Sequence, residues 1–320
     1  MINSVRQTVM SVLNKNNYGY ISPSDFNLFA KQAQLDLFEN YFYSYNYQIN
    51  KENANKSGTG YADITKGIEE VIDTFSVTIP LLSAAGSEYY LPSLITTNND
   101  YYLINKILIN NKVLISGTTT AVAAGTNEII DTSGVDFVTA GVKVGDIVGV
   151  EVGGVAYNLI VTAVDLTGTI LTVASTILNS TPLSYTVYTA DKKKEAEKVT
   201  HSKITMLNNS LLTKPNLSYP AYTQEALLAQ TYPVTINKEG QIVCQYIRFP
   251  YAPKWTFVDL TNGEPAFDAS QSDYQDFELP NDDEVNLVNK ILQYAGMSIR
   301  EISVVQFGKA EEQANTQESK

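Results

Sequence analysis

The chain has 320 residues, of which 44% are hydrophobic and 18% are charged, so it is long enough for two globular domains and too apolar for general disorder. Its net charge of −12 at pH 7 argues against general electrostatic binding to nucleic acid. The single cysteine, Cys244, excludes an internal disulfide and a metal site built from several thiolates, and its alternating surroundings indicate a buried structural thiol.

We expect neither a leader peptide nor a membrane span. Residues 1–13 contain one arginine and no continuous apolar run, which argues against a secretory signal peptide. No stretch approaches the ~18 consecutive apolar residues of a membrane-spanning helix. The sequence therefore predicts a soluble protein that is made in a cytoplasm and has no membrane partner.

Two helices are predicted near the start of the chain. Apolar residues recur at helical spacing in residues 2–13, and the polar run 14–19 predicts the turn that ends this helix. Ser22-Pro23-Ser24-Asp25 offers capping hydroxyls and a proline in the first turn of a second helix. The far end of that second helix, residues 41–47, is dense in aromatic side chains.

The periodicity then changes from helical to extended. Residues 53–60 predict a polar loop, and residues 61–75 predict a third short helix with isoleucines in register. From Val77 the apolar period shifts towards two, which is typical of strands. Residues 101–108 are predicted to form a strand or a short helix.

Residues 113–190 differ in composition from the sequence on either side. They hold nine of the chain's 18 glycines. They also hold 14 threonines but only one basic residue, Lys143. β-branched residues alternate in runs such as Ile147-Val148-Gly149-Val150-Glu151-Val152, which predicts short strands joined by tight turns. Because helical sequence flanks this segment, we expect a small β-barrel inserted into a partly helical host domain.

The host sequence resumes after a charged run. Residues 191–199 are rich in lysine and glutamate and predict a solvated connection. Residues 204–212 predict a helix. Residues 232–236 and 241–249 predict two strands that form a hairpin around Lys238-Glu239-Gly240.

An acidic stretch precedes the last predicted helices. Residues 259–284 hold nine acidic side chains and no basic ones, in a spacing that fits a solvated loop better than a Ca²⁺ site. A helix is predicted over residues 284–294, with Gly296 as its end. Ser298-Ile299-Arg300-Glu301 is a capping box for one more helix, and residues 310–320 predict a flexible tail.

The sequence carries no familiar arrangement of catalytic, cofactor-binding or metal-binding residues, so we expect no enzyme activity and no cofactor. His201 stands beside a lysine-rich run, which favours an exposed or interface residue over a general base. Ser57-Gly58-Thr59-Gly60 lacks the lysine and the preceding strand of a phosphate loop and predicts a turn. Trp255 follows a proline-stiffened arm and is interpreted as a packing residue. A polymer hydrolase stays open as an alternative, because glycoside hydrolysis requires only two carboxylates at a set distance.

Several runs resemble structural proteins of crAss-like and related short-tailed bacteriophages. The runs are Val5-Arg6-x-Thr8-Val9 with Asn14-Lys15, residues 19–35, Pro215 with Pro220-Ala221-Tyr222, Tyr246-Ile247-Arg248-Phe249-Pro250, Pro253-Lys254-Trp255 and residues 291–301. The run Gly141-Val142-Lys143-Val144-Gly145-Asp146-Ile147-Val148 is similar to small barrel modules that are common in such virion proteins.

The resemblance implies an α+β head–tail connector protein. Its host domain, a helical bundle with β-structure, would comprise residues 1–112 plus 200–309. The inserted barrel would occupy 113–190, followed by the charged connection 191–199 and, after the host domain, the flexible tail 310–320. The resemblance carries no catalytic residues.

Connectors of this kind form a twelve-fold ring below the portal of the virion, around the DNA channel. The implied partners are other copies of the chain, the portal protein, other tail ring proteins and genomic DNA that passes without specific binding. An acidic channel wall would repel DNA phosphates and leave the genome mobile. The implied location is the head–tail junction of the virion, after synthesis in the bacterial host cytoplasm.

Two expectations concern the contacts of such a ring. The 21 tyrosines against one tryptophan suit extensive wet interfaces, although ordinary core packing is an alternative. Residues 38–47 and the terminal helices are the expected ring contacts, and residues 297–320 are expected to dock on a neighbouring subunit or the portal. The alternative function is a virion fibre or decoration protein whose barrel binds a receptor or glycan, in which case trimers are expected.

Overall fold

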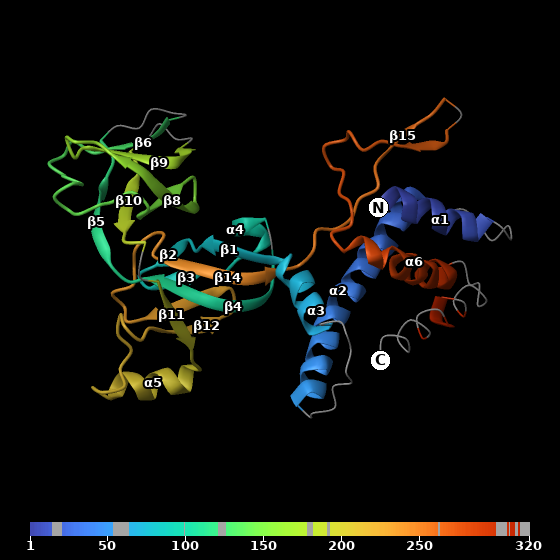
Figure 1. Ribbon diagram of the computed structural model, residues 1–320, viewed down its shortest axis with the longest axis horizontal. Helices are drawn as coiled ribbons and strands as arrows, with labels where there is room; N and C mark the ends of the chain where they lie inside the picture. Colours follow the sequence, from blue (N-terminus) through green and yellow to red (C-terminus); the bar gives the residue numbers. More distant parts are fainter. Residues whose placement is uncertain are drawn as a thin grey trace. The chain divides into compact units, whose positions relative to one another are not determined.

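The structure is a computed structural model that describes residues 1–14, 21–53, 64–98, 100–120, 126–177, 182–190, 193–261, 263–298, 306, 308–310 and 313 (Figure 1). The chain is a mixed α+β protein. It divides into two compact units, Met1–Phe75 with Pro250–Lys320, and Ser76–Phe249. The first we call the helical unit and the second the sheet unit. The boundaries of these units, at Phe75 and Phe249, differ from the expected interruption of a host domain at residues 113 and 190.

The helical unit is built from amphipathic helices. Its elements are α1 (Ile2–Asn14), α2 (Pro23–Asn53), α3 (Ile64–Asp73), η1 (Asn281–Asp283), α6 (Glu284–Ser298) and a hairpin of β15 (Phe257–Asp259) and β16 (Pro265–Phe267). α2 packs against both α3 and α6, and α1 also packs against α6. α1 buries Val5, Val9 and Leu13 of the predicted apolar stripe, together with Ile2, whereas Val12 is half-buried. The three predicted N-terminal helices are confirmed, and the turn at 14–19 and most of the polar loop at 53–60 lie outside the described residues.

The last described helix departs from prediction. α6 continues through Gly296 to Ser298, so the predicted end at Gly296 is wrong. The apolar side chains of Ile291, Leu292 and Ala295 are fully buried, and their burial outweighs the roughly 1 kcal/mol that a helical glycine costs. The capping box that follows lies, apart from Ser298, outside the described residues.

Part of the C-terminal segment packs on its own chain. Gly308 is buried, and a Cβ built on it would lie 2.7 Å from Gln293 Cγ and 3.0 Å from the Asn289 carbonyl oxygen of α6. The expectation that the whole of residues 297–320 avoids the chain's own core is therefore wrong at this position.

The sheet unit contains an eight-stranded sheet in the order β1-β14-β4-β11-β12-β13-β3-β2. The strands are β1 (Ser76–Pro80), β2 (Ser83–Ala85), β3 (Glu88–Tyr90), β4 (Tyr101–Asn110), β11 (Lys193–Lys198), β12 (Ala221–Glu225), β13 (Leu228–Tyr232) and β14 (Ile242–Arg248). Two helices accompany them, α4 (Leu94–Thr97) and α5 (His201–Asn209). Only the β11–β12 pair is parallel among the described pairings of this sheet.

The predicted charged connection at 191–199 is wrong over most of its length. Residues Lys193–Lys198 form β11, which pairs with β4 on one side and β12 on the other. Ala196 is buried while its charged neighbours are exposed, and Lys106 on β4 lies 3.3 Å from Glu195. Strand alternation places Lys193, Glu195 and Glu197 on the face opposite Ala196, where an open sheet meets water and accommodates their charges.

The predicted hairpin around Lys238-Glu239-Gly240 is also wrong. β13 pairs with β12 and β3, whereas β14 pairs with β1 and β4, so the two strands lie in separate parts of the sheet. β13 ends at Tyr232 because Pro233 has no N–H to donate to a ladder. The hairpin in this region joins β12 to β13 through Ala226 and Leu227, and Ala226 has a φ of 49°.

A second, six-stranded sheet occupies the segment of distinct composition. Its order is β5-β10-β7-β8-β9-β6, with bounds β5 (Val113–Thr118), β6 (Thr126–Ile130), β7 (Ile147–Val152), β8 (Val155–Val164), β9 (Ile170–Ile177) and β10 (Ser184–Tyr188). The sheet curls, so that its two edge strands, β5 and β6, approach each other. Thr120 N, just beyond β5, donates a hydrogen bond to the Ile130 carbonyl oxygen at the end of β6, at 2.9 Å. Its core is its own, centred on Val148, Val161 and Val173.

The topology explains how the two sheets are joined. β4 and β11 are antiparallel neighbours, and the six-stranded sheet leaves the end of one and returns to the start of the other. Thr189 N donates to the Lys112 carbonyl oxygen at 3.2 Å, so the two ends of the excursion meet. The six-stranded sheet is thus an elaboration of one strand connection of the eight-stranded sheet.

Candidate interaction surfaces

The residues singled out for chemistry are structural or exposed. Cys244 is buried in β14, and burial raises the pKa of its thiol to about 12, so the thiol stays protonated at neutral pH. His201 is exposed in the first turn of α5. Within the described ranges, no group of three or more His, Cys, Asp or Glu side chains is placed to hold a metal ion. The run Ser57-Gly58-Thr59-Gly60 lies outside these ranges.

Trp255 is a packing centre, as its sequence context predicts. Its ring is 2% exposed and stacks on Phe257 and Phe267 at centroid distances of 5.6 and 5.9 Å. The Arg6 guanidinium carbon lies 3.8 Å from the ring centroid, a cation–π geometry. The indole N–H donates to Asn3 Oδ1 at 3.1 Å, so α1 and the β15–β16 hairpin meet on one side chain.

The acidic stretch 259–284 is more ordered than the predicted solvated loop. Asp276 accepts from Ile2 N at 2.7 Å, and Glu278 accepts from Tyr251 N at 2.7 Å. Asp273 forms an ion pair with Lys254, and Asp283 accepts from the Tyr41 hydroxyl. These carboxylates accept hydrogen bonds from backbone and side-chain donors that have no partner in a helix or sheet. The same hydrogen bonds hold the carboxylates in place. The prediction of a purely solvated loop is wrong.

The β15–β16 hairpin forms an arm of the helical unit, which we define as residues 257–267. Strand alternation places Phe257 and Phe267 on the face that packs on Trp255. Val258 lies on the opposite face and is 49% exposed, and Leu260, just beyond the strand, is 50% exposed. The arm therefore has one aromatic face that packs and one apolar face that does not.

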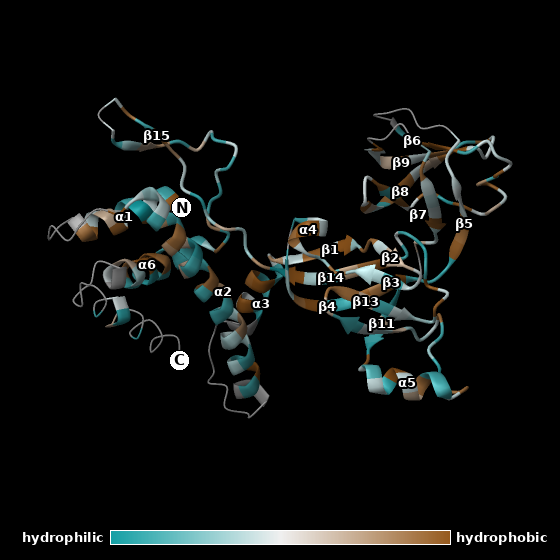
Figure 2. Cartoon of the chain, turned by 180° about the vertical axis from the view of Figure 1, so that it is seen from behind, coloured by the Kyte–Doolittle hydropathy of each residue, from teal (hydrophilic) through white to brown (hydrophobic). Residues whose placement is uncertain are grey.

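A second exposed apolar surface lies on the sheet unit. We define the α5 surface as residues 201–220, which comprise α5 and the chain that leads to β12. Leu211 and Leu212 are 94% and 96% exposed, and Met206 and Tyr219 are also largely exposed. α5 itself is held by a Thr200 cap and by the buried Ile204. Figure 2 shows the mixture of hydrophobic and hydrophilic residues along this helix.

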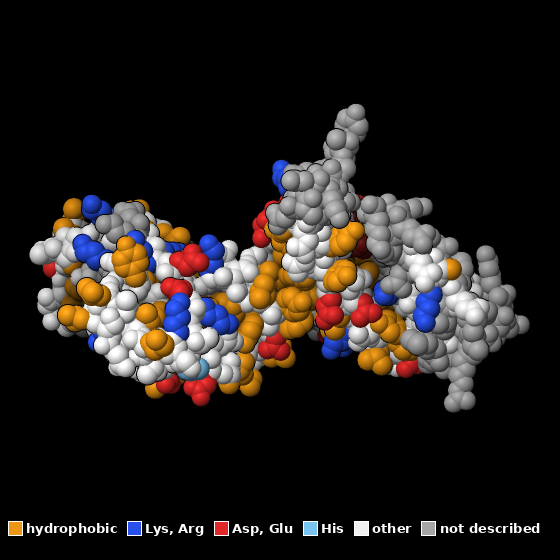
Figure 3. Space-filling model, turned by 90° about the horizontal axis from the view of Figure 1, so that it is seen from below, with side chains coloured by type: hydrophobic (Ala, Val, Ile, Leu, Met, Phe, Trp, Pro, Cys, Tyr) orange, Lys and Arg blue, Asp and Glu red, His pale blue; other side chains and the backbone are white. Residues whose placement is uncertain are grey.

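The charge of the α5 surface is positive. Lys203 and Lys214 are exposed, and the segment 201–220 contains no acidic residue. Lys203 Nζ lies 2.7 Å from Glu197 Oε1 of β11. Figure 3, drawn from the side that carries α5, shows hydrophobic side chains in orange among Lys and Arg side chains in blue and Asp and Glu side chains in red.

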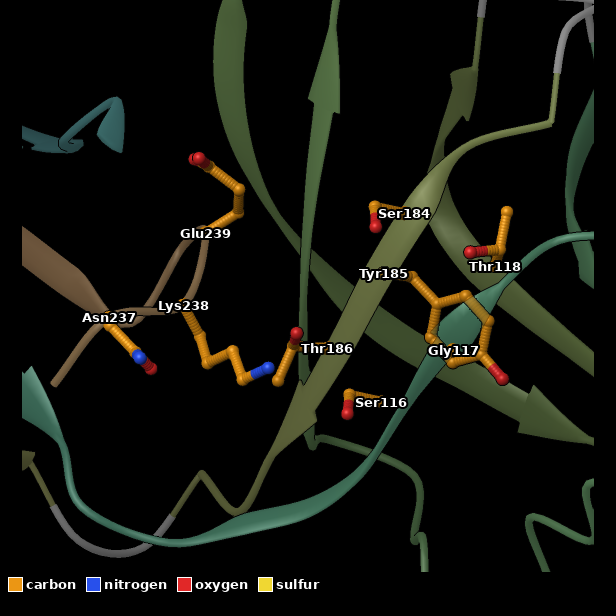
Figure 4. Close-up of a pocket in the computed structure, with 9 residues that line it drawn as sticks. All are labelled: Ser116, Gly117, Thr118, Ser184, Tyr185, Thr186, Asn237, Lys238 and Glu239. Atoms are coloured by element: carbon orange, nitrogen blue, oxygen red, sulfur yellow. The ribbon is translucent and has the colours of Figure 1, made fainter. Parts of the chain in front are cut away.

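A polar groove of about 370 Å³ lies where the six-stranded sheet meets the turn before β14 (Figure 4). Its lining is mostly hydroxyl and amide groups, namely Ser116, Gly117, Thr118, Ser184, Tyr185, Thr186, Asn237, Lys238 and Glu239. Figure 4 shows the Lys238 side chain extending from its turn towards Thr186 on β10.

Two tyrosine hydroxyls anchor the turn beside this groove. Tyr89 donates to the Lys238 carbonyl oxygen at 3.0 Å, and Tyr188 donates to the Glu239 carbonyl oxygen at 2.6 Å. Burial raises the pKa of the Glu239 carboxyl and the charge of Glu151 adds to this, while a hydrogen bond from Ser83 N lowers it. The two tyrosine hydrogen bonds hold the turn that forms one wall of the groove.

Neither the arm nor the α5 surface is recognisable from the sequence as an exposed apolar surface. Most of the arm falls in the acidic stretch that predicts a loop, and the pair Leu211-Leu212 does not by itself signal exposure. Leucines at helical spacing normally predict a buried face. Only the three-dimensional structure shows that Leu211 and Leu212 have no covering element among the described residues.

The comparisons with known proteins identify no family for the chain. No family model matches it, and no curated protein matches it significantly. Among the described helices, none is both long enough and apolar enough to cross a membrane.

Proposed function

We propose that the chain is a virion structural protein that assembles into a closed ring of the head–tail connector of a short-tailed bacteriophage. In this proposal the ring lies below the portal and surrounds the DNA channel. The helical unit with the eight-stranded sheet is the connector body, and the curled sheet of residues 113–188 is its inserted small barrel. The chain acts without enzyme activity or cofactor.

The observation that carries the proposal is that each compact unit exposes a different apolar surface. A closed ring is built from head-to-tail contacts, in which one patch of each subunit meets a different patch of the next. The arm, with Val258 and Leu260, supplies one exposed surface, and the α5 surface, with Leu211 and Leu212, supplies another. Neighbouring exposed apolar side chains are one feature of protein interaction sites.

The charge supports the same proposal. The net charge of −12 at pH 7 disfavours tight binding of DNA phosphates, as a channel through which a genome moves requires. Partners in this proposal are other copies of the chain, the portal and neighbouring tail rings.

The test is the oligomeric state of the full chain, measured by mass photometry and electron microscopy over a concentration series with and without portal protein. We expect a discrete closed ring of about twelve copies. The double variant Leu211→Asp/Leu212→Asp is expected to prevent assembly, while Leu166→Asp, at a 99% exposed site of the six-stranded sheet, leaves it intact. A chain that stays monomeric with portal present would contradict the proposal.

The polar groove favours a second candidate, a fibre or decoration protein that binds a glycan through the six-stranded sheet. Hydroxyl and amide groups such as Ser116, Thr186 and Asn237 line the groove and are suited to hydrogen-bond a saccharide. Trimers in solution, together with host-glycan binding that Asn237→Ala abolishes, would favour this candidate over the ring.

A further inference from the structure

We infer that in the ring the arm of one copy docks on the α5 surface of the next copy. This inference rests on the proposed ring function and goes beyond it by naming the contact that closes the ring. Three observations carry it: the uncovered face of the arm, the opposite charges of the two surfaces, and their presence once in each chain.

One face of the arm is not covered by any of the residues that the structure describes. An isolated two-stranded hairpin is marginally stable in water, and this one gains support from Trp255 on its aromatic face. On the other face, Val258 is about half exposed and pairs across the hairpin with Ala266. Leu260, equally exposed, extends that face towards the hairpin tip. An apolar partner surface would cover this second face of the arm.

The two surfaces are complementary in charge. The arm carries Asp259 and Glu264, both exposed, and no basic residue. The α5 surface carries two exposed lysines and no acidic residue: Lys214, and Lys203, which also contacts Glu197 of β11 at 2.7 Å. Opposite potentials around an apolar centre steer association and set its register, and like charges disfavour arm-to-arm or surface-to-surface contacts.

A second copy of the chain is the occupant that these features favour. Each chain presents one acidic arm and one basic α5 surface, so the two are always available in equal numbers. A contact between different patches on identical subunits propagates from copy to copy and closes when the rotation permits. An external partner would satisfy only one of the two surfaces.

Charge reversal on each side tests the contact. Asp259→Lys/Glu264→Lys on the arm and Lys203→Glu/Lys214→Glu on the α5 surface are each expected to raise the half-assembly concentration about tenfold or more. The chain with all four changes is expected to recover assembly, and so is an equimolar mixture of the two double variants. Lys31→Glu/Lys143→Glu, a matched reversal of two exposed lysines elsewhere, is expected to have little effect. Circular dichroism verifies that each variant is folded.

Cross-linking tests the same contact without requiring closed rings. A Leu260→Cys chain mixed with a tagged Leu212→Cys chain is expected to form an intermolecular disulfide, since Cys244 is buried and does not compete. Leu166→Cys in place of Leu212→Cys is the control and is expected not to form one.

The outcomes separate the two proposals. If the wild-type chain forms rings but charge reversal has no effect, or the four-fold variant and the mixture fail to recover, the docking contact is overturned and the ring function stands. Absence of the Leu260–Leu212 cross-link at concentrations where rings form also overturns the contact. A wild-type chain that shows neither rings nor the cross-link overturns both.

Discussion

At the scale of single residues, the helical unit depends on side chains that join distant parts of the chain. Trp255 contacts Arg6 and Asn3 from α1 and two phenylalanines from the arm. Asp276 accepts a hydrogen bond from the main chain at Ile2. Such residues hold together a unit whose two sequence segments are separated by the whole sheet unit.

Replacing Trp255 with alanine should destabilise the helical unit. The change removes a 2% exposed indole with its stacking and cation–π contacts, and large-to-small core changes of this kind cost about 3–5 kcal/mol of unfolding free energy. Urea unfolding followed by circular dichroism measures the loss. Tyr43→Ala is the control, since Tyr43 is 76% exposed, and it should change stability by less than about 0.5 kcal/mol. Equal losses in the two variants would contradict the assigned role of Trp255.

Asp131 should make the sheet unit sensitive to acid. The carboxylate is buried and accepts hydrogen bonds from the Tyr185 hydroxyl at 2.6 Å and Ser133 N at 3.0 Å. Burial alone would raise the pKa of Asp131, but the hydrogen bonds from Ser133 and Tyr185 outweigh it and lower the pKa. A lowered folded-state pKa contributes stability above the unfolded pKa of about 3.9 and loses it as the pH falls below that value.

The Asp131→Asn variant checks this sign. It should be less stable than the wild type by about 1–3 kcal/mol at pH 7, and the difference should shrink as the pH is lowered from about 4 to 2. Urea unfolding at a series of pH values measures both. A difference that stays constant down to pH 2 would show that the carboxylate charge contributes nothing.

At the scale of elements, the two sheets of the sheet unit meet at a close backbone contact. A Cβ on Gly149 of β7 would lie 2.6 Å from the Glu239 carbonyl oxygen and 2.9 Å from Gly240 Cα. Gly240 adopts a φ of +67°, and a Cβ there would lie 2.5 Å from Gly149 Cα. Two glycines thus permit an approach that any side chain would prevent.

Gly149→Ala should therefore destabilise the sheet unit by about 1–3 kcal/mol, because the added methyl meets backbone that has little room to move. Gly67→Ala is the matched control in the exposed interior of α3, where a Cβ meets nothing within 4 Å. That control should stabilise its helix by up to about 1 kcal/mol. Thermal unfolding of both variants measures the opposite signs, and a neutral Gly149→Ala would contradict the close contact.

The six-stranded sheet should be removable as an element. Its ends meet between paired strands β4 and β11, and its core is separate from that of the eight-stranded sheet. Replacing residues 114–189 with a short Gly/Ser linker should leave a soluble, cooperatively unfolding protein, as size-exclusion chromatography and circular dichroism would show. Aggregation of this variant would indicate that the eight-stranded sheet needs its elaboration in order to fold.

At the scale of the whole molecule, the chain passes once from the helical unit to the sheet unit and once back. Ser76 at the start of β1 pairs with Ile247 near the end of β14, so the two crossings leave the sheet unit side by side. In the helical unit, by contrast, α1 and α2 pack on α6 from the far end of the chain.

A fragment of residues 76–249 should fold alone. The fragment contains every strand of the eight-stranded and six-stranded sheets, so it loses none of their strand pairings. We expect dispersed amide signals in NMR spectra and a cooperative thermal transition. A fragment of residues 76–112, which lacks both strands that pair with β4, is the control and should remain unfolded. An unfolded 76–249 fragment would show that the sheet unit depends on the helical unit.

The sequence by itself determined the local elements of this protein. The periodicity of residues 2–13 predicts α1, the capping run before Phe26 predicts the start of α2, and the composition break at Val113 coincides with the first strand of the six-stranded sheet. The packing role of Trp255 and the burial of Cys244 also follow from their local contexts. These features are encoded by neighbours within a few turns of helix or one strand, where spacing and propensity act directly.

The tertiary structure alone decided which strands pair and which apolar residues stay exposed. The charges of β11 predict a solvated connection and the turn before β14 predicts a hairpin with the preceding segment, whereas β11 and β14 both pair with β4. Strand pairing joins residues distant in sequence, and a strand's own residues do not specify its partner. Exposure of Leu211, Leu212, Val258 and Leu260 depends on what the rest of the chain leaves uncovered, and that is a property of the folded molecule.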